Sequence, residues 1–62
     1  MTGTELKKLR QSAGLTQEAL AALIGWRGGR MSVYMAESGR RVISATAAIA
    51  IRAVIEKLQN NT

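Results

Sequence analysis

The stretch GLTQEALAALIG, residues 14–25, decides the fold that we predict from this sequence. Thr16 can cap a helix, and Glu18 would lie in its first turn, where the helix dipole favours an acidic side chain. Gly25 is the residue type that most often ends a helix in the left-handed conformation. A helix of only about eight residues is stable only when other elements pack against it. The apolar residues that form one face for this packing are Ala19, Leu20, Leu23 and Ile24.

A first helix is expected before this stretch. Thr4 can cap it, and it would run to about Ala13, with Gly14 as its left-handed stop. Leu6 and Leu9 mark its inner face.

Two more helices are expected after residue 25. The third is short and ends near Glu37, and Ser44 can cap a fourth that covers about 45–58, with 59–62 fraying. The prediction is an all-α fold, a small four-helix domain that occupies residues 1–62 as a single unit.

The charge balance indicates an anionic partner. The chain has nine Lys and Arg against four Asp and Glu, a formal net charge of +5. Such an excess is typical of small domains that bind a polyanion or an acidic membrane. No apolar run approaches the ~20 residues of a membrane span, and the start has no signal-peptide core. We therefore expect a cytoplasmic protein. Binding to a membrane surface is disfavoured, because the basic residues cluster in and beside turns and not along one long amphipathic face.

The residue types limit the chemistry of the chain. It contains no Cys and no His, which removes disulfides, zinc sites, thiol nucleophiles and the usual general base. We therefore expect that the protein is not an enzyme, and that it uses no cofactor, no metal and no small-molecule ligand.

Two segments, LKKLRQSAGLTQEALAALIG at 6–25 and ESGRR at 37–41, carry a family resemblance. They resemble the Cro/CI-like (XRE) helix-turn-helix regulators of phages and plasmids, which include small anti-CRISPR-associated autoregulators. The resemblance covers roughly residues 4–55 and implies a shortened lambda repressor-like DNA-binding fold. The sequence departs from the family in a longer spacing between Gly25 and Glu37, in lacking the Pro after the basic loop, and in lacking a fifth helix.

The resemblance also implies a function. It suggests a sequence-specific DNA-binding regulator, a dimeric repressor or autorepressor that reads an inverted-repeat operator with its third helix in the major groove of double-stranded DNA. The alternative is an antitoxin-like module that uses the same fold to hold another protein.

The longer spacing leaves two registers open for the third helix. Counting back from Glu37 puts Val33 and Ala36 inward, whereas counting forward from the turn glycine puts Met31 and Tyr34 inward. We favour the first register, because ESGRR is the better anchor.

A structural ion pair supports this choice. The resemblance implies that Arg10 on the first helix pairs with Glu37. An inward Glu37 without this partner would be an uncompensated charge.

The resemblance and the position of the third helix imply two sets of DNA contacts. A recognition helix puts its N-terminal residues against base edges, and Arg30 could donate to O6 and N7 of guanine. The residues expected to read bases are Arg30, Met31, Ser32 and Tyr34. The residues expected to contact phosphates are Gln17, Arg27, Gly29, Arg40 and Arg41.

These assignments compete with structural alternatives. The glycines at 28–29 could form only a loose turn, and the arginines at 40–41 could lie in a solvated loop. Trp26 is expected to pack into the core at the turn, while Lys7 and Lys8 are expected on a solvated helix face.

The fourth helix is apolar on nearly every side, which is typical of a helix buried on every side. One stripe would cover the other helices, and a chain this short has too little protein to bury the second. Without disulfide or metal, a partner subunit is the remaining way to stabilise a domain of this size. The alternative is a modest exposed patch. We expect a homodimer whose interface includes Ile49, Ala53 and Ile55.

Overall fold

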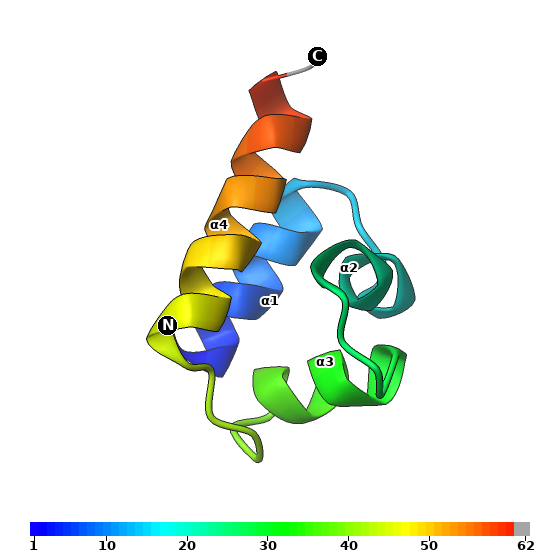
Figure 1. Cartoon of the computed structure of the whole chain (residues 1–62), viewed down its shortest axis with the longest axis vertical. Coiled ribbons are helices and arrows are strands. Elements are labelled where there is room, and N and C mark those ends of the chain that lie inside the picture. The colour runs from blue at the N-terminus through cyan, green and yellow to red at the C-terminus, as the bar shows by residue number, and fades with distance from the viewer. Residues whose placement is uncertain (61–62) are drawn as a thin grey trace.

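The computed structural model describes residues 1–60, which form four helices and no strand. α1 and α4 lie side by side along the long axis, and α2 and α3 lie on one flank of this pair (Figure 1). α3 lies at the end of the molecule away from the C-terminal end of α4 (Figure 1). The all-α class with four helices is confirmed. The helices are α1 (Gly3–Ser12), α2 (Gln17–Ile24), α3 (Arg30–Glu37) and α4 (Ala45–Asn60).

The first three helices end in the same way. After each one, a glycine takes a positive φ and two backbone hydrogen bonds close a Schellman motif. At the end of α2, Gly25 has a φ of 73°, and the N–H of Trp26 donates to the Ala21 carbonyl at 2.9 Å. This bond turns the chain back, so Trp26 packs on the core as expected.

The N-terminal ends follow the predicted capping chemistry with one correction. Thr16 and Ser44 cap α2 and α4 as predicted. α1, however, is capped by Thr2 and not by Thr4, which lies inside the helix. The Thr2 hydroxyl accepts the Glu5 N–H at 3.1 Å, and the Glu5 carboxylate accepts the Thr2 N–H at 3.4 Å. This reciprocal capping box satisfies two N–H groups, which a cap at Thr4 would not do.

α4 is longer than predicted. Its helix continues through Gln59 and Asn60, so the expectation that these residues fray is wrong; 61–62 lie outside the described residues. The Gln59 side-chain amide donates to the Ser12 hydroxyl at 3.2 Å and ties this end of α4 to the end of α1. Even at this length, no helix within residues 1–60 is long and apolar enough to cross a membrane.

The core lies where all four helices meet, and it decides the register of α3. Val33 is 0% exposed and Ala36 is 1% exposed, whereas Met31 and Tyr34 are 58% and 48% exposed. The register counted back from Glu37 is therefore correct. The buried core residues are Leu6, Leu20, Ala21, Val33, Ala36, Ile51 and Ile55.

The burial of Ile55 corrects the predicted dimer surface. Ile55 is 2% exposed and follows Ile51 by four residues, so both lie on the face of α4 that covers the core. A fully buried side chain cannot contact a second subunit. Of the three predicted interface residues, Ile49 and Ala53 are exposed.

The inner face of α2 also differs from its prediction. Leu20 and Ala21 are buried, but Leu23 is 48% exposed. Leu23 lies with Val54 and Leu58 around a hollow of about 280 Å³ between α2 and α4. The short α2 therefore covers only part of the side of α4 that it faces.

α1 and α3 pack closely at one point that the sequence did not reveal. A Cβ on Gly3 would overlap the carbonyl oxygens of Ala36 and Glu37. Only glycine lets the first turn of α1 approach the end of α3 this closely. This contact helps to fix the C-terminal end of α3.

Candidate nucleic-acid interface

The start of α3 depends on an unusual backbone conformation. Gly29, its N-cap, has a φ of 62° and a ψ of −146°, a region that side-chain-bearing residues essentially avoid. Its N–H donates to the Trp26 carbonyl at 3.1 Å. That N–H is therefore already used, and the expected phosphate contact through Gly29 is not supported by this geometry.

The outer face of α3 is exposed from its first turn. Arg30, Met31 and Tyr34 point away from the core, which Val33 and Ala36 contact from the opposite face. An open hollow of about 300 Å³ is lined by Arg30, Met31 and Tyr34, together with Gln17 from the first turn of α2. The structure therefore brings together three of the four residues expected to read bases.

Ser32, the fourth expected base-reading residue, lies elsewhere. It is half-buried and does not line this hollow. A Cβ on Gly28 would overlap the Ser32 hydroxyl, so this side chain sits against the turn before the helix. We therefore remove Ser32 from the base-reading set.

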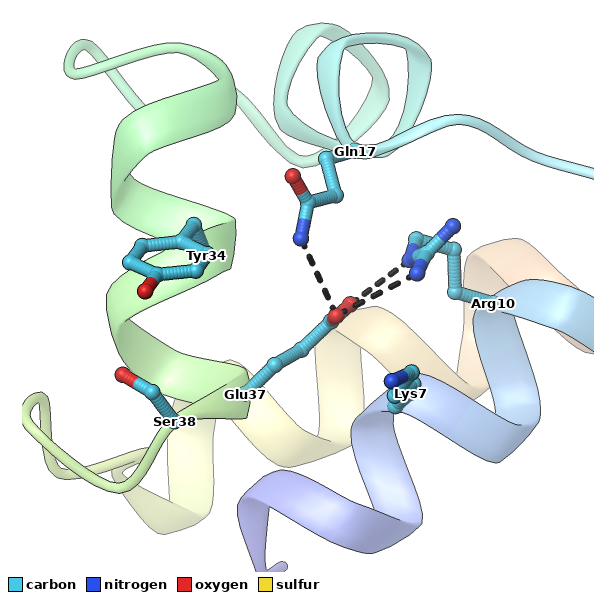
Figure 2. A pocket seen from close by; sticks show the side chains of 6 residues that line it. All are labelled: Lys7, Arg10, Gln17, Tyr34, Glu37 and Ser38. Carbon is cyan, nitrogen blue, oxygen red and sulfur yellow. Dashed lines mark hydrogen bonds and ion pairs between the residues drawn. The ribbon is translucent and has the colours of Figure 1, made fainter.

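A partly buried ion pair holds the other end of α3. The Arg10 Nε donates to Glu37 Oε2 at 2.6 Å and its Nη2 donates to Oε1 at 3.2 Å (Figure 2). The two side chains are only 12% and 6% exposed. Arg10 also donates to the Leu15 carbonyl at 2.9 Å, which links the pair to the loop between α1 and α2. The Glu37 carboxylate therefore connects α3 with α1.

Gln17 extends this connection to α2. Its side-chain Nε2 donates to Glu37 Oε1 at 3.1 Å (Figure 2). Because one amide hydrogen is used in this way, a phosphate contact by Gln17 would have to use the second hydrogen. The bond also holds the Gln17 side chain beside the exposed face of α3.

Lys7 is a candidate contact residue that the sequence assigned to a solvated face. It lines a second hollow, of about 240 Å³, between α1 and α3, together with Arg10, Gln17 and Tyr34 (Figure 2). Residues three apart on a helix share a face, so the spacing of Lys7 and Arg10 was a signal for this placement. The two hollows share Gln17 and Tyr34 and so adjoin one another.

Basic side chains flank α3 on both sides. Arg27 lies in the turn before the helix, while Arg40 and Arg41 follow it, and all three are exposed. The N–H groups of Arg40 and Arg41 both donate to the Met35 carbonyl, at 2.9 and 3.2 Å, so this loop is not a loose one. The Arg41 guanidinium also lies 4.0 Å from the centroid of the Trp26 ring, a cation–π contact that sequence reasoning missed.

This arrangement defines the class of protein. Two short helices, α2 and α3, are joined by a tight turn, and the second presents an exposed face between basic flanks, as in a helix-turn-helix domain. A model of the helix-turn-helix domain family matches residues 3–56, and the chain belongs to that family. No curated protein and no solved structure matches the chain.

Proposed function

We propose that the chain is a sequence-specific DNA-binding transcriptional regulator that reads double-stranded DNA with α3 in the major groove. The observation that carries this proposal is the exposed face of Arg30, Met31 and Tyr34. An arginine at the start of the helix can donate two hydrogen bonds to guanine. Met31 and Tyr34 offer apolar surface to thymine methyl groups or sugars.

The flanking residues supply the contacts that position such a helix. Arg27, Arg40 and Arg41 are exposed cations on either side of α3, and Gln17 stands at its exposed face. Phosphate contacts fix the orientation of a protein on the duplex and carry no sequence information directly. The net charge of +5 favours the same partner.

We propose further that the protein binds as a homodimer to an inverted repeat and represses transcription by blocking RNA polymerase, with its own gene as a target. Ile49 is 70% exposed and Ala53 is also exposed on α4. Ile55, which is buried, is left out of this set. Ile49 and Ala53 are four residues apart and therefore share one exposed face of α4, which supports a contact with a second subunit at this face.

A footprint of the purified protein on the DNA upstream of its own gene tests this proposal. A protected inverted repeat, with half-sites about 34–36 Å apart or a multiple of that, is the expected result. Uniform or absent protection along that DNA would overturn autoregulation. Sequence specificity would be overturned if the protein bound DNA in a salt-dependent way but preferred no site, neither upstream of its own gene nor on any other DNA tested.

The second candidate is an antitoxin-like module that holds another protein. The apolar hollow of Leu23, Val54 and Leu58 is the observation that favours it. Salt separates the two functions, because DNA binding should weaken with a log–log slope of about −0.9 per phosphate neutralised. The affinity for a protein partner held in an apolar hollow need not fall with salt in this way.

A further inference from the structure

The contact between Trp26 and Arg41 joins the two segments on either side of α3. Trp26 lies in the turn before the helix and Arg41 in the loop after it, yet the guanidinium carbon of Arg41 is 4.0 Å from the ring centroid. α3 itself spans about 12 Å. The side-chain contact therefore brings together segments that the helix separates.

The two partners differ in how firmly they are held. Trp26 packs on the core and its N–H donates to the Ala21 carbonyl at 2.9 Å, so the ring is fixed by the fold. Arg41 is exposed, and its guanidinium forms no ion pair with a carboxylate within residues 1–60. The fixed ring therefore holds the arginine, and no carboxylate of the described residues pairs with its charge.

We propose that Trp26 is a positioning residue that holds the Arg41 guanidinium beside α3 for contact with a DNA phosphate. A guanidinium stacked on a ring keeps the N–H groups at its edge available for hydrogen bonds. A long side chain also loses less conformational freedom on binding when it is already ordered, and less of the binding free energy is then spent on ordering it. This proposal rests on the proposed DNA binding. In it, Trp26 strengthens DNA binding through Arg41 and does not itself contact DNA.

A Trp26 substitution could weaken DNA binding simply because it disturbs packing in the core. The test therefore uses a double-mutant cycle. The variants are Trp26→Leu, Arg41→Gln and their combination, with Trp26→Phe as the conservative control, because Phe keeps an aromatic face. Binding is measured by fluorescence anisotropy on a short labelled duplex of random sequence over a series of salt concentrations. Thermal unfolding of each variant shows that it is folded at the assay temperature.

The positioning role predicts a specific pattern of affinities. Trp26→Leu should weaken binding by about two- to tenfold, because the Arg41 side chain must then be ordered during binding. Arg41→Gln should weaken binding and lower the salt slope by about one. Trp26→Leu should have no further effect in the Arg41→Gln background, and Trp26→Phe should stay within about twofold of the unmodified protein.

An NMR measurement on the free protein tests the contact itself. The Arg41 side-chain protons above an aromatic ring should be shifted upfield, and this shift should disappear in Trp26→Leu. If the effects of the two substitutions on binding are additive, or if the upfield shift is absent, the positioning role is wrong while DNA binding stands. If the unmodified protein does not bind the duplex even at low salt, the proposed function fails and this inference fails with it.

Discussion

At the residue scale, Arg30 is the side chain that most directly tests sequence reading. It is exposed in the first turn of α3 and lines the hollow with Met31 and Tyr34. We predict that Arg30→Ala weakens binding to a specific site by about 1–3 kcal/mol and relaxes base preference at one position in each half-site. Competition between the specific site and random DNA measures the loss of affinity for each. An equal loss on both would make Arg30 a phosphate contact.

Arg40 should behave differently, because we propose that it contacts a phosphate. Arg40→Ala should weaken binding to all DNA and flatten the salt slope by about 0.9, with base preference unchanged. Lys57→Ala removes the same charge from the last turn of α4, far from α3 along the molecule (Figure 1), and serves as the control. Equal salt slopes for the two variants would assign Arg40 to the solvated loop.

Two adjacent glycines provide a matched test of the backbone. Gly29 has a φ of 62° and a ψ of −146°, so Gly29→Ala should destabilise the fold by about 1–3 kcal/mol. Gly28 has no positive φ, and the Ser32 hydroxyl that its Cβ would meet can rotate away. Gly28→Ala should therefore change stability by less than about 0.5 kcal/mol. Urea unfolding compares them, and similar losses would show that the turn is not strained at Gly29.

At the scale of the helices, the Arg10–Glu37 ion pair holds α3 in place. Removing one partner leaves the other charge unpaired in a partly buried position, so Arg10→Met should destabilise the protein by up to about 3 kcal/mol, the lower end of the range for a fully buried pair. The exposed pair Arg52–Glu5, at 3.4 Å with side chains 59% and 51% exposed, is the control, and Arg52→Met should cost less than about 1 kcal/mol. Denaturant unfolding measures the stability of both variants, and a loss of less than about 1 kcal/mol for Arg10→Met would mean that the Arg10–Glu37 pair contributes no more than an exposed one.

The helices themselves were largely predictable, because their signals are local. Thr16 and Gly25 set the limits of α2, and Ser44 set the start of α4. The start of α1 was misplaced because two threonines near the N-terminus can both cap, and only Glu5 at the right spacing selects Thr2. The length of α4 was underestimated because the bond from Gln59 to Ser12 joins residues far apart in the chain.

The candidate site was less predictable, because it depends on packing between helices. Periodicity indicated that Val33 lies inward and Tyr34 outward only after a register was chosen from Glu37. Ile55 lies four residues after the buried Ile51, and this spacing was a signal for its burial that the prediction did not use; Ile49, which is 70% exposed, lies on another face. The Trp26–Arg41 contact likewise depends on where two separate loops lie, which the sequence alone did not indicate.

At the scale of the whole molecule, the exposed side of α4 is the proposed contact between subunits. Ile49→Glu would place a charge there without touching the core, so it should give a folded monomer with greatly weakened binding to an inverted repeat. Gln11→Glu changes an exposed residue on α1 by the same charge and should remain dimeric. Sedimentation of both proteins measures the assembly. An Ile49→Glu variant that still sediments as a dimer would place the interface elsewhere.

Selection of bound duplexes from a random-sequence pool measures whether α3 reads a DNA sequence. The unmodified protein should enrich one inverted repeat with half-sites about one helical turn, 34–36 Å, apart. Arg30→Ala should enrich the same repeat with one position in each half-site relaxed. If the protein binds the pool but enriches no sequence, or if Arg30→Ala and the unmodified protein enrich identical pools, α3 does not read DNA through Arg30.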